Sequence, residues 1–92
     1  MIKSFRHRGL KRLYERDDRS QVGADMLDKI ENILAKLDTS DSPEKMALPN
    51  FRLHQLKGDL KGFWAVTVRA NWRIIWRFEG PDAVEVDLID YH

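Results

Sequence analysis

Three histidines are the side chains of this 92-residue sequence that exchange protons near neutral pH. His54 lies near the end of an apolar run, and His92 is the last residue, directly after Asp90 and Tyr91. Two imidazoles, one acting as base and the other as acid, can cleave a phosphodiester without a metal ion when cations stabilise the phosphate. The simpler alternative is that His54 lies on the surface and His92 in a frayed end. Residue type alone leaves both interpretations open, whereas His7, in a basic segment, is expected to be a solvated surface group.

The composition excludes several other kinds of chemistry. The chain has no cysteine, which excludes disulfides, thiolate zinc sites and cysteine nucleophiles. Its histidines do not occur in the His-x-His or His-x-x-x-His spacing that is typical of metal sites. We therefore expect neither a metal nor a cofactor.

Charge is arranged in four blocks that the net charge of +1 hides. Residues 1–16 and residues 50–77 each contain six bases and one acid. Residues 17–49 contain eight acids and four bases, and residues 78–92 contain five acids and neither lysine nor arginine. The basic blocks fit a surface for phosphate backbones, or they pair with the acidic blocks inside the fold. The charges alone leave these two interpretations open.

Length and hydropathy predict one small domain. With 42% hydrophobic and 10% aromatic residues, the chain has enough apolar mass for one core and too little for two. We therefore expect a single domain over residues 1–92. No apolar run approaches the roughly 20 residues of a membrane helix, and the first residues lack the apolar block of a signal peptide. These features predict a cytoplasmic protein without membrane contact.

The first half of the chain is predicted to be mainly helical. Alternation over residues 2–6 allows a short first strand. Apolar residues at helical spacing predict a basic helix over residues 7–16, weakened by Gly9, and the main helix near residues 22–38. A proline at its first position favours a further short helix within residues 43–48.

The second half is predicted to be an antiparallel sheet. Residues 51–56, 63–69, 72–78 and 84–89 alternate in polarity between turn signals. One face carries the apolar residues Trp64, Val66, Val68, Trp72, Ile74, Trp76, Phe78, Val84, Val86 and Leu88. Six of them are expected to pack on the main helix, namely Trp64, Val66, Ile74, Trp76, Val84 and Val86. The order of elements predicts an α+β fold, an antiparallel sheet with the N-terminal helices packed on one face.

The other face of the predicted sheet is charged. It carries Arg73 and Arg77, and the next strand brings Glu85 and Asp87 beside them across the ladder. This pairing accounts for part of the charge without any ligand. The three tryptophans, in contrast, are expected in the core, with at most one reaching a substrate.

Five runs of residues form a combination that is more specific than any one of them: Met1–Phe5, Phe51–Asp59, Gly62–Val68, Asn71–Ile74 and Asp90–His92. Together they resemble the HigB toxins of bacterial toxin-antitoxin systems, which belong to the RelE/ParE superfamily. The resemblance extends over essentially the whole chain and implies a RelE/ParE-like microbial RNase fold.

The resemblance also implies roles for individual residues. The implied catalytic group is His54, Asp90, Tyr91, His92 and Arg73. The residues expected to hold phosphate are Lys57, Arg69 and Lys61 and, on the basic first helix, Arg8, Lys11 and Arg12. For that helix, a solvated face is the alternative. The family pattern commonly has proline at Gln55 and serine at Ala65, and both departures leave the reactive groups intact.

The activity that the resemblance implies is ribosome-dependent cleavage of translated mRNA by attack of the 2′-hydroxyl, which inhibits translation. Its partners would be the ribosomal decoding site, mRNA and a HigA-like helix-turn-helix antitoxin, with operator DNA reached only through the antitoxin. Two other functions fit the same scaffold: ParE-like inhibition of DNA gyrase, and antitoxin binding without catalysis. Two histidines favour the enzyme, because an inhibitor needs no paired titrating groups. Which histidine is the base stays open.

Overall fold

The computed structural model describes residues 1–91, which form two α-helices and a four-stranded sheet. The helices are α1 (Arg8–Arg16) and α2 (Leu27–Asp38), and the strands are β1 (His54–Gln55), β2 (Trp64–Arg69), β3 (Trp72–Glu79) and β4 (Asp82–Asp90). Short 3₁₀ helices cover Pro43–Met46 and Gly58–Leu60. The first of these confirms the short helix predicted within residues 43–48.

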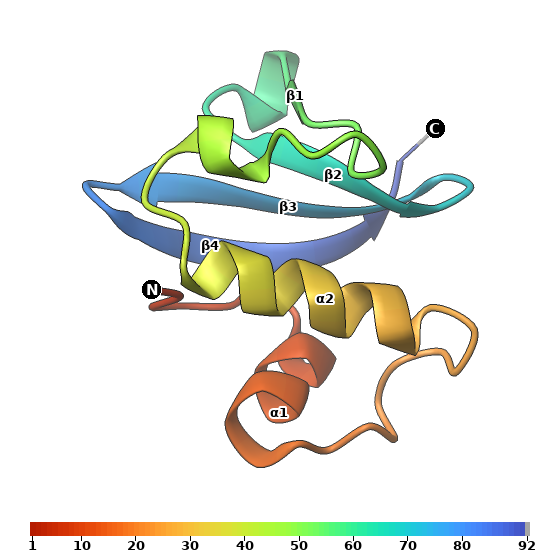
Figure 1. Cartoon of the computed structure of the whole chain (residues 1–92). Helices are drawn as coiled ribbons and strands as arrows, with labels where there is room; N and C mark the ends of the chain where they lie inside the picture. Colours follow the sequence, from red (N-terminus) through yellow and green to blue (C-terminus); the bar gives the residue numbers. More distant parts are fainter. Residues whose placement is uncertain (92) are drawn as a thin grey trace.

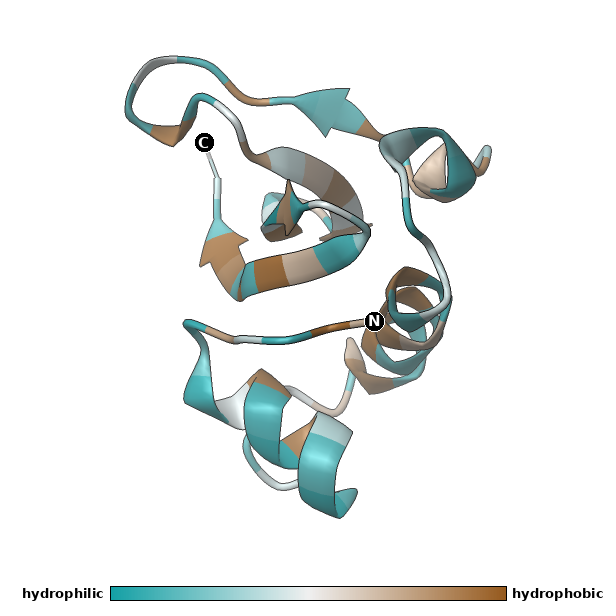
Figure 2. Cartoon of the chain, turned by 90° about the vertical axis from the view of Figure 1, so that its left-hand side faces the viewer, coloured by the Kyte–Doolittle hydropathy of each residue, from teal (hydrophilic) through white to brown (hydrophobic). Residues whose placement is uncertain are grey.

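The sheet is antiparallel throughout, and its strands lie in the order β1-β2-β3-β4. Figure 1 shows α1 and α2 together on one side of it, and Figure 2 shows the curvature of the strands. The predicted α+β architecture is therefore confirmed. Within residues 1–91, no helix has the length and apolar character needed to cross a bilayer.

The main core lies between the helices and the adjacent face of the sheet, as the alternation predicted. Its most deeply buried residues come from both layers: Leu10, Ile30, Ile33, Leu37, Val66, Ile74, Trp76 and Val86. The prediction that all three tryptophans are core is wrong, because Trp72 is 36% exposed. Alternation identifies the face on which a side chain lies, but it does not show whether a helix covers that part of the face.

α1 begins at an unexpected cap. The Nδ1 atom of His7 accepts a hydrogen bond from the backbone N of Leu10 at 3.1 Å, so the half-buried His7 caps the helix and is not a solvated group. Gly9 allows close packing, because a Cβ there would lie 2.9 Å from the backbone O of Gln21. Any larger residue at Gly9 would push α1 away from the following loop.

α2 begins five residues later than predicted. Val22 is buried, but the chain turns immediately after it, and the backbone N of Met26 donates to Gly23 O at 3.0 Å. The first helical residue is Leu27. The apolar spacing thus extends beyond the helix, because residues in a packed turn can contact the same core.

One predicted strand is absent and another is shorter than expected. Residues 2–6 form no strand and instead make isolated parallel bridges to β4 at Ile2 and Phe5. The predicted strand over residues 51–56 is reduced to the two residues of β1, because Arg52 has a left-handed φ of 53° that interrupts the extended backbone.

A bulge in β4 moves one predicted core residue out of the main core. The pairing with β3 shifts by one residue near Glu85, which has a left-handed φ of 55°. Ala83 joins the main core, whereas the buried Val84 lies outside it, so the prediction for Val84 is wrong. The Glu85 carboxylate accepts hydrogen bonds from Arg77, which confirms that predicted pair, and from Arg6 at 2.8 Å.

Candidate active site on the second face of the sheet

Two of the predicted reactive groups, His54 and Arg73, lie on the face of the sheet opposite the helices, which we call the site face. Pairing across the strands forms one row from His54, Ala65, Ile75 and Asp87. The adjacent row on the same face contains Thr67, Arg73 and Ile89. His54 and Arg73 are thus one row and two strands apart, about 10 Å across the ladder. That separation fits a segment of sugar-phosphate backbone between them.

A small second core supports the site face. It consists of residues that are at most 5% exposed, namely Leu56, Phe63, Ala65 and Ile75, and the half-buried Leu60 and Ile89 pack against it. The guanidinium of Arg6 lies 4.9 Å from the centroid of the Phe63 ring. The row that contains His54 is therefore supported by this small second core, which is separate from the main core.

His54 is exposed and is held in one tautomer by its own segment. Its Nδ1 lies 3.0 Å from the backbone carbonyl O of Arg52. A carbonyl only accepts hydrogen bonds, so Nδ1 donates and carries the proton of the neutral ring. The lone pair is then on Nε2, for which the structure shows no hydrogen-bond partner within residues 1–91. Nε2 is thus the nitrogen that can accept a proton from a substrate.

Arg73 is anchored by the hairpin turn beside it. Its Nη1 donates to the carbonyl O of Ala70 at 2.7 Å and to that of Trp72 at 3.3 Å. Its Nε is buried and has no acceptor within residues 1–91. Both hydrogen bonds to backbone carbonyls come from Nη1, so Nη2 is the nitrogen that can donate to an added oxygen ligand.

Lys57 and Lys61 line a hollow of about 340 Å³ that begins at Gln55, the residue after His54. The loop around this hollow turns at two glycines with φ of 66° and 95°, which confirms the predicted turns there. Both lysines are exposed, and neither makes an ion pair within residues 1–91. Their ammonium groups are therefore available to an anion beside His54.

The end of β4 lies against the hairpin turn that anchors Arg73. The backbone N of Tyr91 donates to Asn71 O at 2.8 Å, and the Tyr91 side chain is 40% exposed. Asp90 pairs in register with Trp72, so by alternation its side chain lies on the helix side of the strand. The predicted role of His92 concerns a position outside the described residues.

Arg69 differs from the other predicted phosphate ligands, because a carboxylate already occupies its guanidinium. It forms an ion pair with Asp25, a residue of the loop that precedes α2. The register therefore places Lys57 and Lys61 on one side of His54 along the strands and Arg73 on the other, whereas Arg69 is directed toward the helical layer.

Comparison with known proteins identifies the family. Residues 3–92 match the family model described as a RelE-like toxin of the type II toxin-antitoxin system HigB. The chain belongs to the HigB-like toxin family. It is 45% identical, over the full 92 residues of both chains, to the Endoribonuclease HigB of Proteus vulgaris. A copper-bound mutant toxin from Helicobacter pylori is similar in fold, with a TM-score of 0.54 at 15% identity over 98% of this chain and 94% of that one.

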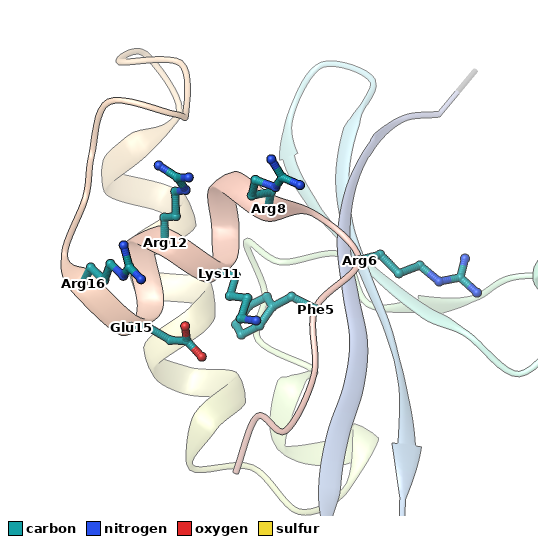
Figure 3. A pocket seen from close by; sticks show the side chains of 7 residues that line it. All are labelled: Phe5, Arg6, Arg8, Lys11, Arg12, Glu15 and Arg16. Carbon is teal, nitrogen blue, oxygen red and sulfur yellow. The ribbon is translucent and has the colours of Figure 1, made fainter.

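The toxin carries a second group of cations on the outer surface of α1. They border a hollow of about 330 Å³ lined by Phe5, Arg6, Arg8, Lys11, Arg12, Glu15 and Arg16 (Figure 3). Except for Arg6, these cations make no ion pair within residues 1–91. Figures 1 and 2 both place α1 and β1 at opposite ends of the molecule. The structure thus separates this basic surface of α1 from His54.

The sequence analysis missed several residues that position the site. Arg6 closes the site face over Phe63, and its hydrogen bond and that of Arg77 hold the pKa of the Glu85 carboxyl below its usual value. The basic start and acidic end of the toxin could have suggested this contact. Nothing in the local sequence indicates the carbonyl of Arg52 that orients His54. Within residues 1–91, no cluster of three or more potential metal ligands occurs.

Proposed function

We propose that the toxin is a ribosome-dependent endoribonuclease that cleaves translated mRNA without a metal ion, through one RelE-like domain over residues 1–92. The observation that carries this proposal is His54, whose Nδ1 faces the Arg52 carbonyl and whose Nε2 is left to take a proton. The Endoribonuclease HigB of Proteus vulgaris, 45% identical over its full length, supports the same reaction class.

The proposed reaction uses the RNA's own 2′-hydroxyl as nucleophile. His54 Nε2 removes the hydroxyl proton, the 2′-oxygen bonds to the adjacent phosphorus, and the bond from phosphorus to the 5′-oxygen breaks. The 5′-oxygen leaves with a proton from the acid, the role we propose for His92. The products are a 2′,3′-cyclic phosphate and a 5′-hydroxyl, so no cofactor is consumed.

The other proposed site residues bind and position the substrate. Arg73, anchored through Nη1 by the hairpin turn, stabilises the charge that develops on the phosphorane. Lys57 and Lys61 hold flanking phosphates. Tyr91 stacks on or hydrogen-bonds the nucleotide. Asp90 lies on the helix side of β4, so we propose that it orients a histidine or the nucleotide from the end of that strand.

The basic surface of α1 gives a reason for dependence on the ribosome. It lies on α1, at the opposite end of the molecule from β1, so we assign Arg8, Lys11 and Arg12 to ribosomal RNA near the decoding site. The mRNA would then lie on the site face. We propose a HigA-like helix-turn-helix antitoxin as the partner that silences the toxin, with operator DNA contacted only through it.

Cleavage of mRNA in vitro tests this proposal. Purified toxin should barely cut naked mRNA, and programmed ribosomes should switch cleavage on, less strongly as salt rises. Sequencing of RNA ends after brief induction in cells should show new ends within translated codons. DNA damage linked to gyrase without new RNA ends would support the ParE-like alternative, and neither effect would support a binding module.

A pair of histidine variants tests the role of His54. His54→Ala should slow cleavage about a hundredfold to ten-thousandfold without changing thermal melting, because His54 is exposed. His7→Asn is the matched control, since it removes an imidazole but keeps a good helix cap. Equal loss of activity in both variants, or full activity of His54→Ala, would contradict the assignment.

A further inference from the structure

One two-residue turn supports several of the proposed RNA-binding groups. Ala70 and Asn71 join β2 to β3, the Ala70 carbonyl anchors Arg73, and the Asn71 carbonyl accepts from the backbone N of Tyr91. Arg69 is the residue directly before this turn. Its Cα therefore lies beside the substrate groups, although its guanidinium is held elsewhere.

Asp25 is the residue that holds this guanidinium. Its Oδ2 pairs with Arg69 Nη1, and its Oδ1 lies close to Gly23, where a Cβ would be only 3.1 Å away. The two side chains are 61% and 60% exposed. An ion pair this exposed to water contributes little to the stability of the fold. A phosphate that reaches Arg69 can therefore replace Asp25 at little cost.

The other ion pairs around the site face are less easily exchanged. Arg77 pairs with Glu79 and with Glu85, and its side chain is only 34% exposed. Lys57 and Lys61 make no ion pair within residues 1–91. Arg69 is thus the predicted phosphate ligand whose availability depends on one exposed carboxylate.

We propose that Asp25 competes with a substrate phosphate for Arg69 and thereby sets the affinity of the toxin for RNA. The inference rests on the proposed RNA site, but it concerns binding and not the chemical step. In the free toxin Asp25 directs Arg69 toward the helical layer. In the complex the guanidinium leaves Asp25 and binds phosphate, for which its planar donors are well suited.

Binding of an uncleavable RNA tests the competition. The probe is a fluorescein-labelled RNA dodecamer with every 2′-hydroxyl methylated, and its anisotropy gives the dissociation constant. Asp25→Asn should bind about two- to fivefold more tightly than the unmodified toxin. Its plot of log affinity against log salt should be steeper by about 0.7, the value for one added phosphate contact on a single strand.

Two further variants separate competition from a general charge effect. Asp28→Asn removes the same charge three residues away, where the 97% exposed carboxylate contacts Arg19 and not Arg69, and it should change affinity and salt slope much less. In an Arg69→Gln background, Asp25→Asn should have no effect. Equal gains for Asp25→Asn and Asp28→Asn, a gain that persists without Arg69, or no measurable binding by any variant would overturn the proposal.

These results are independent of the proposed catalytic function. Loss of mRNA cleavage with the expected binding pattern would refute the nuclease and leave the competition intact. Ribosome-dependent cleavage with equal affinities for Asp25→Asn and Asp28→Asn would refute the competition and leave the proposed nuclease intact. If Asp25 were purely structural, Asp25→Asn would lower the melting temperature and weaken RNA binding, which is the reverse of the expected sign.

Discussion

Adjacent isoleucines on β3 provide a test of the two separate cores. Ile74 lies in the main core and is fully buried, and Ile75 lies in the small core beneath the site face with 1% exposure. Ile75 shares its row with His54, whereas Ile74 faces the helices. Ile74→Ala and Ile75→Ala therefore make the same chemical change on opposite faces of one strand.

Both substitutions should destabilise the toxin, but by different amounts. Removing three carbons from a buried site costs about 2.5 kcal/mol in lost burial, before any cavity forms. The large cluster around Ile74 holds its shape, so a cavity should raise that cost to about 4 kcal/mol. The small core around Ile75 is bordered by the half-buried Leu60 and Ile89, which can move inward to fill a cavity. We therefore expect a cost of about 3 kcal/mol at Ile75.

Activity should distinguish the two variants more clearly than stability. Urea denaturation followed by tryptophan fluorescence gives each free energy of unfolding, and cleavage on programmed ribosomes is normalised to the folded fraction. Ile75→Ala should lower this specific activity at least tenfold, because His54 loses its support, and Ile74→Ala should leave it within about twofold. An unchanged urea midpoint for Ile75→Ala, or equal loss of specific activity in both variants, would show that the site face has no separate supporting core.

Three further predictions concern single contacts. Ala70→Gly should stabilise the toxin by about 0.5 kcal/mol in urea denaturation, because Ala70 has a left-handed φ of 51°. The hydrogen bond to Asp38 raises the pKa of Tyr14 from 10.0 to about 12, so this contact stabilises the fold below pH 10 and is lost as pH rises toward 12. Tyr14→Phe should flatten that alkaline decline and, after discounting for solvent exposure, cost about 0.5 to 1 kcal/mol at neutral pH. Arg73→Lys should cut single-turnover cleavage at least tenfold with unchanged melting, because an ammonium cannot keep the turn contact and also bind phosphate.

The period of the apolar residues was sufficient to predict the main features of the fold. Helical spacing indicated both helices. Alternation assigned β2 and β3 to the correct faces, because their side chains keep alternating between the two cores although the pairing shifts between Thr67 and Arg69. Two of the errors, the length of β1 and the place of Val84, occur where the backbone takes a left-handed conformation at Arg52 and Glu85. Neither residue type favours that conformation. At Glu85 it is held by partners distant in sequence, the hydroxyl of Ser4 and the guanidinium of Arg6, which no local window contains.

The candidate site was predicted less completely than the fold. Residue types and the family resemblance selected His54, Lys57 and Arg73, and the sheet places all three on or beside the site face. Their geometry depends on backbone carbonyls of Arg52 and Ala70, whose directions follow from φ values and not from side-chain chemistry. For this reason a sequence can identify the reactive groups but not which nitrogen of His54 is free.

Part of the charge in the four blocks is paired inside the fold, and another part is left without ion pairs within residues 1–91, where phosphate binding stays a prediction. The acidic blocks do neutralise basic ones: Arg69 pairs with Asp25, and Arg77 pairs with Glu85. This pairing is selective, since the hollow on α1 and the loop around Lys57 and Lys61 contain cations without ion pairs within residues 1–91. Anion-binding surfaces need such excess charge, and mutual repulsion opposes its accumulation in a small fold. A net charge of +1 is therefore compatible with two polyanion-binding surfaces, because the acids are placed where they neutralise structural arginines and leave these surfaces basic.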